Sequence, residues 1–456
     1  MRKKLILTFS IVALLCTALF SAPVQAATFN INFTPNCKSI YLLNLDTDTP
    51  VYELNADERR APASITKIMT YIIVSEHVSD PDNTIVTIDK SIVDEELSGT
   101  GSSLANLADE EQMSVSNLLR CLMIPSGNDA AVVLADYVGS GDIDAFVQMM
   151  NDKAAELGLA NTHFMNPHGL HHPEHYTTAR DMATITKYAM ECDSQFMEIT
   201  NTPSYILPTS NVRTDPNDYT LSLINTNDLI RKNSALPQYY YQYAKGIKTG
   251  WHDEAGRCLV STATKDGYTY LCVAMGGDSE KDGQKYNGAE DDSVKLYEWA
   301  FDNLEAKSIV DLEEPVKEIP LELAWQKDTL KLLPAENIRA MLPKNVSLAS
   351  IEIRANDDVP ESAVAPVQKG QVFGTATITY ANEVLGTVNL VSSEEIERSE
   401  LMYYMQGAKN IITSKWFLIA ATIFVLLFVS YLILSAVYNK RNKRKRRRKV
   451  RKYRKL

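Results

Sequence analysis

The stretch Ala61-Pro-Ala-Ser-Ile-Thr-Lys-Ile-Met69 carries a hydroxyl and an amine three residues apart. Apolar residues recur at helical spacing over residues 65–78, which predicts a core-facing helix entered through Pro62. Ser64 and Lys67 then share one face of that helix. Free amides at the helix N-terminus favour negative charge that develops at Ser64. The stretch is the only Ser-x-x-Lys of the chain, although a serine at this place also suits an ordinary helix cap.

Two further triplets bring groups of related chemistry. Ser126-Gly-Asn128 offers a hydroxyl and an amide on a sharp turn between helices predicted at 113–122 and 129–138. Lys248-Thr-Gly250 offers an ammonium, a hydroxyl and a glycine that permits close approach of a ligand backbone. Each triplet alone also fits a plain polar turn or strand. Their joint occurrence in one chain, which the following features indicate is exported and tethered to a membrane, favours one shared site.

The N-terminal segment predicts export. Three basic residues at positions 2–4 precede an apolar run at 5–20, and Val24 and Ala26 fit the small-residue cleavage pattern. We interpret residues 1–26 as a secretory signal peptide. An uncleaved anchor helix is the alternative, but the run is short for one.

The C-terminal segment predicts a membrane anchor. Residues 416–437 hold no charge, and 22 residues of helix are long enough to cross a bilayer. Residues 438–456 contain 13 Lys or Arg and no acid, which predicts a cytoplasmic tail and an extracytoplasmic catalytic region on a single-pass membrane protein. A basic run can also bind nucleic acid or anionic lipid. Its place directly after the apolar segment favours the interpretation that these charges fix the orientation of the chain in the membrane.

The charge and the cysteine content of the chain exclude two other classes of protein, nucleic-acid-binding proteins and disulfide-stabilised scaffolds. The 456-residue chain has a formal charge of −11, yet residues 27–415 carry 30 basic and 57 acidic residues, a net charge of −27. Repulsion from phosphates excludes nucleic acid as a partner of that region. Without Cys16 of the predicted signal peptide, five cysteines remain along a long chain, so we expect no disulfide scaffold.

The rest of the chain divides into two predicted domains. Strands at 258–263 and 268–274, joined by Asp266-Gly267, predict a hairpin that pairs Ser261 with Cys272 and leaves Cys258 on the other face. A helix at 288–304 ends the first domain, 27–306. Prolines then interrupt short alternating runs, which predicts a small all-β domain at 307–399 with a linker at 400–415. We see no catalytic group in that second domain and interpret it as a spacer or docking module.

The three triplets are the motifs of the serine penicillin-binding and β-lactamase superfamily. The chain resembles low-molecular-mass penicillin-binding proteins of the D-alanyl-D-alanine carboxypeptidase type over roughly residues 35–400. The stretches that carry the resemblance are Ala61-Pro-Ala-Ser-Ile-Thr-Lys-Ile-Met69, Met123-Ile-Pro-Ser-Gly-Asn-Asp-Ala130, Asn166-Pro-His-Gly-Leu170, His175-Tyr-Thr-Thr-Ala-Arg-Asp-Met-Ala183 and Gly246-Ile-Lys-Thr-Gly250.

The resemblance implies an α+β fold. Its first part is a transpeptidase/β-lactamase-like domain, an antiparallel sheet flanked by helices with a helical subdomain that carries Ser126 and Asn128. A small all-β domain and a C-terminal transmembrane helix follow.

The resemblance also implies the chemistry. Ser64 is the implied nucleophile that attacks the bond between the last two D-alanines of a peptidoglycan stem peptide, and penicillins are implied covalent inhibitors. Lys67 is its implied general base, and Ser126 the relay that protonates the leaving amine. Our hypothesis is that turnover rises from neutral toward alkaline pH as Lys67 loses its proton. No cofactor is expected.

The remaining implied roles concern binding. Asn128 holds the substrate amide and Lys67, while Lys248 and Thr249 bind the terminal carboxylate. Gly250 lets the substrate approach, and the backbone N–H groups of Ser64 and Trp251 form the oxyanion hole.

Three features of the sequence depart from the family pattern or compete with this interpretation. The residue after Lys-Thr-Gly is often His in such carboxypeptidases, whereas here Trp251 precedes His252, which leaves a side-chain role open. The tyrosines of residues 236–244 are expected either to line the groove or to form a solvent-facing β edge. Four histidines at positions 168, 171, 172 and 175 lie in a Pro- and Gly-containing loop without a His-Glu-x-x-His pattern, so no metal is expected.

Other functions remain open at this point. A β-lactamase or a peptidoglycan endopeptidase uses the same motifs. A catalytically silent, membrane-anchored wall-binding scaffold is the alternative from a different class.

Overall fold

The computed structural model describes residues 29–381 and 383–453. The predicted signal peptide, 1–26, lies outside the described residues. Contacts divide the chain into two compact units. The first comprises the chain up to Ile309 with the segments Ile338–Glu352 and Ile378–Gly386, and the second comprises the remainder.

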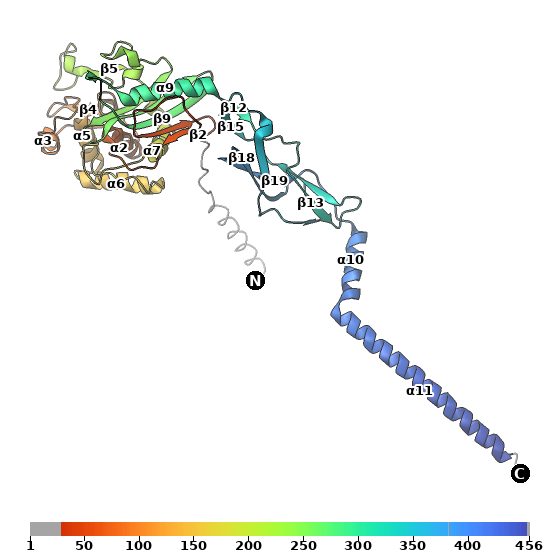
Figure 1. The fold of residues 1–456 in the computed structure, drawn as a ribbon. Coiled ribbons are helices and arrows are strands. Elements are labelled where there is room, and N and C mark those ends of the chain that lie inside the picture. The colour runs from red at the N-terminus through yellow and green to blue at the C-terminus, as the bar shows by residue number, and fades with distance from the viewer. Residues whose placement is uncertain (1–28, 382, 454–456) are drawn as a thin grey trace. The chain divides into compact units, whose positions relative to one another are not determined.

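An antiparallel five-stranded sheet forms the centre of the first unit, in the order β2-β1-β9-β8-β7 (Figure 1). The strands are β1 (Ser39–Asn44), β2 (Thr49–Leu54), β7 (Ala244–His252), β8 (Gly256–Lys265) and β9 (Tyr268–Gly277). The predicted hairpin is confirmed, because Lys265 pairs with Tyr268 across Asp266-Gly267 and Ser261 pairs with Cys272. The five described cysteines are all free, as expected.

Both faces of this sheet are covered by helices. Along β1, Ile40 and Leu42 pack with α9 (Gly288–Asn303), while Tyr41 and Leu43 join the core of α2 (Lys67–His77) and α7 (Ala179–Cys192). Successive side chains of a strand point to opposite faces, so every residue of β1 is buried. The predicted helix at 288–304 is thus confirmed, as is the sheet flanked by helices.

Further helices pack around α2 and carry the Ser126 turn. They are α3 (Lys90–Leu97), α4 (Val115–Met123), α5 (Asn128–Val138), α6 (Ile143–Glu156) and α8 (Gln195–Thr200). The helix predicted at 113–122 begins two residues later. Gln112–Ser114 forms β4 against β3 (Ile85–Thr87), and the Ser114 hydroxyl caps α4 by accepting from the Asn117 N–H.

Short elements complete this unit. They are the hairpin β5 (Ser204–Ile206) with β6 (Ser222–Ile224), the hairpin β10 (Glu280–Lys281) with β11 (Gln284–Lys285), the pair β12 (Leu304–Ser308) with β15 (Arg339–Pro343), and the 3₁₀ turns η1 (Ala63–Thr66), η2 (Tyr219–Leu221), η3 (Asp228–Ile230), η4 (Pro237–Tyr239) and η5 (Leu348–Ser350).

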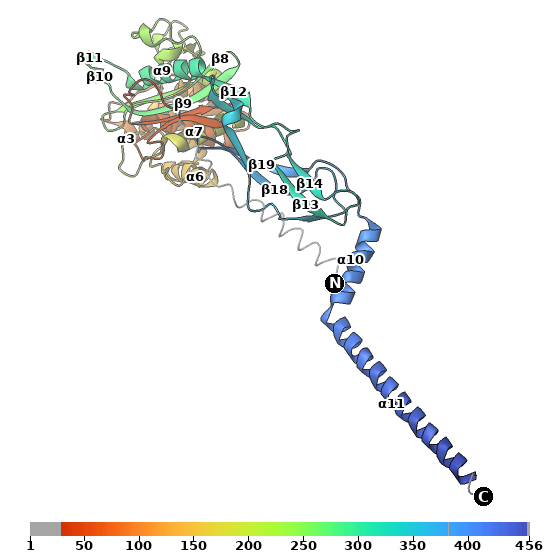
Figure 2. The ribbon, with the colours of Figure 1, turned by 45° about the vertical axis from the view of Figure 1, so that its right-hand side comes forward.

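The segment after the first domain is β-rich, as predicted (Figure 2). A six-stranded sheet has the order β16-β18-β19-β14-β13-β17. Its strands are β13 (Lys317–Glu322), β14 (Thr329–Pro334), β16 (Ile351–Ala355), β17 (Ala363–Val364), β18 (Val372–Tyr380) and β19 (Glu383–Ser392).

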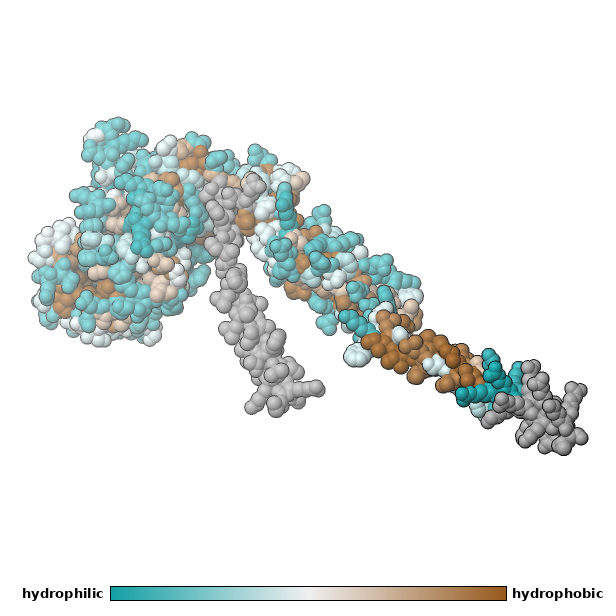
Figure 3. Space-filling model, turned by 60° about the horizontal axis from the view of Figure 1, so that its bottom comes forward, coloured by the Kyte–Doolittle hydropathy of each residue, from teal (hydrophilic) through white to brown (hydrophobic). Residues whose placement is uncertain are grey.

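Two helices end the described chain. The predicted linker at 400–415 contains α10 (Glu400–Thr413), which is followed by α11 (Lys415–Tyr453). The segment Lys415–Arg444 of α11 is long and apolar enough to cross a membrane, because it contains an 18-residue stretch with a mean hydropathy of 2.8 that is not buried in the protein. Figure 3 shows this helix as a continuous hydrophobic band that turns hydrophilic toward its C-terminal end.

Candidate active site

Ser64 lies in the 3₁₀ turn η1, directly before α2. The predicted helix therefore exists, but its first turn is tighter than an α-helix. Lys67 is the first residue of α2, and its Nζ donates a hydrogen bond to Ser64 Oγ at 2.9 Å. The two groups that the sequence places on one helix face are thus in direct contact.

The amine of Lys67 is fully buried and has two further acceptors. Nζ donates to Asn128 Oδ1 at 2.6 Å and to the His168 carbonyl at 2.8 Å. Burial places the pKa of Lys67 well below its usual value, the nearby Lys248 lowers this pKa further, and Asp129 partly opposes both effects. The neutral amine is therefore populated at a much lower pH than in an exposed lysine.

The Ser126-Gly-Asn128 turn brings Asn128 into contact with this lysine and places Ser126 in the lining of the cavity that also contains Ser64. Ser126 has a left-handed backbone with φ +64°, and α5 begins at Asn128. Gly127 is needed at the turn, because a Cβ there would lie 2.7 Å from Asp129 Oδ1 and 2.9 Å from the Cys121 carbonyl. The sharp turn predicted between two helices is confirmed.

Strand β7 presents the Lys-Thr-Gly triplet beside η1. Lys248 is buried, and this burial lowers the pKa of its ammonium to about 7. A Cβ on Gly250 would lie 2.9 Å from the Ser64 backbone nitrogen and 3.0 Å from the Pro62 carbonyl. Only a glycine lets the strand lie this close to the turn that carries Ser64.

A cavity of about 320 Å³ joins these segments. Its lining includes Ser64, Ser126, Thr249, Gly250 and Trp251 from the residues proposed from sequence. Lys67, Asn128 and Lys248 are buried behind that lining, at exposures of 3% or less. The structure thus brings all eight candidate residues into one region.

Charged residues that sequence reasoning missed also line the cavity. They are Asp228, Arg231, Arg257 and Lys285. The Arg257 guanidinium lies over the Trp251 ring at 5.1 Å, since the two residues pair across β7 and β8. The hairpin register could have placed Arg257 next to Trp251. The short elements η3 and β11, which bring Asp228, Arg231 and Lys285, carry no such signal.

The tyrosine-rich segment at 236–244 fits neither expectation as a whole. Tyr239 and Tyr241 are buried in the core beneath α9, and Tyr241 stacks on Tyr297 with ring centroids 6.3 Å apart. Leu236, rather than a tyrosine, lines the cavity. The local sequence, with three consecutive tyrosines at 239–241, gave no indication that two of these rings pack inward against a helix.

The histidine loop is irregular, as predicted, and two of its histidines are buried. His175 Nε2 lies 2.8 Å from Thr66 Oγ1 in η1, and the His168 carbonyl accepts from Lys67. Burial lowers the pKa of each ring to about 3, so both are neutral at physiological pH. These side chains support the turn around Ser64.

Comparison with known proteins gives this arrangement its family. The sequence profile described as D-alanyl-D-alanine carboxypeptidase matches residues 26–279. The chain belongs to this family. A second profile, described as penicillin-binding protein 5, C-terminal domain, matches residues 305–398 of the carboxypeptidase.

Individual relatives agree with both profiles. The carboxypeptidase is 31% identical over 371 residues to D-alanyl-D-alanine carboxypeptidase DacF of Bacillus subtilis, which covers 81% of this chain and 88% of that one. It is 30% identical over 430 residues to DacA of Escherichia coli, with coverage of 88% and 95%. Penicillin-binding protein 5 from Haemophilus influenzae superposes with a TM-score of 0.62 at 26% identity, over 81% of this chain and all of that structure. The predicted fold class and the serine carboxypeptidase activity are confirmed.

Gly250→Ala is expected to slow acylation by a β-lactam at least about tenfold, because the new methyl meets backbone atoms of the Ser64 turn and must push β7 away. A misplacement of about 1 Å in a catalytic site costs on the order of a hundredfold in rate. Stopped-flow acylation of both proteins measures the effect. Gly386→Ala is the matched control, since its Cβ would meet only Ile338 at 3.5 Å. An unchanged rate for Gly250→Ala would contradict the close approach.

Proposed function

We propose that this carboxypeptidase removes the terminal D-alanine from peptidoglycan stem pentapeptides through an acyl-enzyme on Ser64. The observation that carries the proposal is the 2.9 Å contact between Lys67 Nζ and Ser64 Oγ, made by a fully buried amine. A lysine with a lowered pKa beside a hydroxyl is an activated nucleophile pair. The Ser64 hydroxyl is in contact with this amine, whereas the rings of His168 and His175 are buried and neutral at physiological pH.

Lys67 acts as the base in its neutral form. Its lone pair accepts the Ser64 proton while its two remaining N–H bonds donate to Asn128 Oδ1 and the His168 carbonyl. Those two acceptors fix the direction of the lone pair. Ser64 Oγ then forms a bond to the carbonyl carbon of the penultimate D-alanine.

The remaining groups bind the substrate and complete the proton balance. Lys248 and Thr249 hold the terminal carboxylate, and the backbone N–H groups of Ser64 and Trp251 stabilise the oxyanion. The carbon–nitrogen bond breaks as Ser126 passes a proton from Lys67 to the leaving D-alanine amine. Water hydrolyses the ester and frees Ser64. β-Lactams acylate the same serine, since they present a reactive amide and a carboxylate.

The charge of the cavity supports a carboxylate-ended substrate. Arg231, Arg257 and Lys285 line it with Asp228, so cations outnumber the acid there, although the exported region as a whole is acidic. A cationic cavity in an acidic protein concentrates an anionic peptide at the site. This contrast also weighs against a silent scaffold, which needs no such cavity.

The pH dependence of acylation tests these roles. We expect the second-order rate with a chromogenic β-lactam to rise as Lys67 loses its proton and to fall again as Lys248 loses its own near pH 7. Burial and the nearby Lys248 both lower the pKa of Lys67, against the opposing effect of Asp129, and burial lowers that of Lys248 to about 7. This expected profile differs from the rise toward alkaline pH expected from sequence, because loss of the Lys248 proton near pH 7 opposes that rise.

Lys248→Arg is the control for the falling limb, because a guanidinium stays charged over the whole range. The variant is expected to keep the rising limb and to lose the falling one. A flat wild-type profile between pH 6 and 10 would rule out Lys67 as the base. A falling limb that persists in Lys248→Arg would rule out Lys248 as its origin.

We further propose export through the signal peptide at 1–26 and anchoring through residues 416–437, with the basic tail in the cytoplasm. The length and apolarity of α11 and the charge of the tail support this topology. External protease is expected to degrade the catalytic region on intact spheroplasts and to spare an epitope fused after Leu456. Loss of that epitope from unlysed spheroplasts would show that the C-terminal tail lies outside the cell and would contradict this topology.

A further inference from the structure

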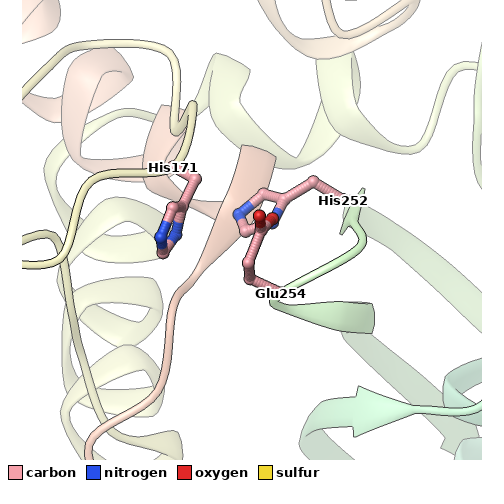
Figure 4. Close-up of side chains that lie close together, drawn as sticks. All are labelled: His171, His252 and Glu254. Atoms are coloured by element: carbon pink, nitrogen blue, oxygen red, sulfur yellow. The ribbon is translucent and has the colours of Figure 1, made fainter.

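We propose that His171, His252 and Glu254 form a binding site for one divalent transition-metal ion of the zinc class. A ring nitrogen of each histidine and a carboxylate oxygen of Glu254 all lie within 4.8 Å of one another. Figure 4 shows His171 on its loop and Glu254 on the turn that follows β7, with its carboxylate beside the ring of His252, the last residue of that strand. None of the three belongs to the residues proposed to act on the substrate.

The donor set suits zinc. Two imidazoles and one carboxylate with an open fourth position form a common zinc environment, with metal–ligand bonds of about 2.0–2.2 Å. Tetrahedral geometry at those lengths separates ligand atoms by roughly 3.3 Å. His252 Nδ1 and Glu254 Oε2 are already 2.9 Å apart. The site therefore needs mainly an approach of His171.

Two of the three side chains, His171 and Glu254, are exposed and therefore have room for such an approach. His252 is held in place, with 17% of its side chain exposed, whereas Glu254 is 55% exposed and His171 is exposed. The two imidazole rings already lie edge to face, with their centroids 5.5 Å apart and an interplanar angle of 60°. Rotation of one exposed histidine side chain closes the site without movement of the core.

His252 supplies an independent sign that a ligand is missing. Its Nδ1 lies 2.9 Å from Glu254 Oε2 and 3.2 Å from the Ala255 backbone N–H, so one atom meets both an acceptor and a donor. Its Nε2 is buried and has no hydrogen-bond partner among the described residues. If the neutral ring carries its proton on Nδ1, that N–H faces the N–H of Ala255. If it carries the proton on Nε2, the Nδ1 lone pair faces the carboxylate of Glu254. A metal ion shared between the ring and Glu254 places a cation where a nitrogen lone pair and a carboxylate meet.

The site connects two segments that contact the catalytic centre. His171 follows His168, whose carbonyl accepts from Lys67, and His252 follows Trp251 at the end of β7. A bound ion would hold the loop and the strand end together. The inferred ion thus has a structural role and takes part in none of the proposed chemical steps. A binding measurement therefore tests the metal site independently of the roles proposed for Ser64 and Lys67.

Calorimetric titration of Zn²⁺ into the tag-free full chain in detergent, after chelator treatment, tests the proposal. We expect one ion per chain with a dissociation constant below about 10 µM. His171→Ala and Glu254→Gln are each expected to weaken binding at least about tenfold, because each removes a ligand. Zn²⁺ should also raise the melting temperature of the wild type, since it binds the folded state, and should raise it less in Glu254→Gln.

His172→Ala and Asp253→Asn are matched controls, because each changes the neighbour of a proposed ligand. Both are expected to bind as the wild type does. Melting temperatures without metal show that each variant folds. The proposal is overturned if the wild type shows no saturable binding, or if His171→Ala and Glu254→Gln bind like the wild type. Loss of binding in His172→Ala alone would also overturn it, because the ligands would then be other histidines.

Discussion

Ser64→Ala is expected to abolish covalent labelling by penicillin and to lower the acylation rate by at least about 10⁴-fold. The Ser64 hydroxyl is the group in contact with the buried amine of Lys67, and removal of a nucleophile from a preorganised site costs several orders of magnitude in rate. The methyl of alanine fits where the hydroxyl was, so the fold is expected to persist. Intact-protein mass spectrometry after incubation with penicillin detects the adduct directly.

The control for this labelling is Ser98→Ala, which removes an exposed hydroxyl at the end of α3. That variant is expected to gain one penicillin per chain, as the wild type does. A stoichiometric adduct on Ser64→Ala would show that another residue is the nucleophile. Melting temperatures of both variants separate loss of chemistry from loss of structure.

Lys67→Gln is expected to slow acylation by about 10²–10⁴-fold, the range that a general base contributes. Glutamine can still donate to the Asn128 and His168 oxygens but has no basic lone pair to accept the serine proton. The rising limb of the pH profile should disappear with the base. Stopped-flow acylation from pH 5 to 10 measures both effects.

Lys90→Gln is the control, since Lys90 makes an exposed ion pair with Asp94. Such surface pairs contribute roughly 0–1 kcal/mol, and neither fold nor acylation should change measurably. A Lys67→Gln rate within about tenfold of the wild type would mean that the Ser64 proton leaves by another route.

The sequence predicts the parts of this protein that depend on local rules. A two-residue Asp-Gly turn fixes the β8–β9 register, so the Ser261–Cys272 pair follows without knowledge of the rest of the fold. Helical spacing likewise places Ser64 and Lys67 on one face. The three motif triplets can be recognised because each is contiguous in the chain.

Long-range packing decides what the sequence does not predict. Tyr239 and Tyr241 face the core because α9 packs over them, and the local sequence around these tyrosines contains no information about that helix. Arg231 reaches the cavity from the end of η3, and Lys285 reaches it from β11. His171 meets His252 only because the histidine loop lies beside the end of β7. The lowered pKa of Lys248 likewise follows from burial, which only the folded chain defines.

The most direct test of Ser64 as the residue that releases D-alanine is a measurement of that release itself. The full chain in detergent is incubated with a short peptide that ends in Lys-D-Ala-D-Ala, beside the Ser64→Ala protein. We expect the wild type to release one D-alanine per peptide and the variant to release none above background. Equal release by both proteins, or none by a wild type that still binds penicillin covalently, would contradict this assignment.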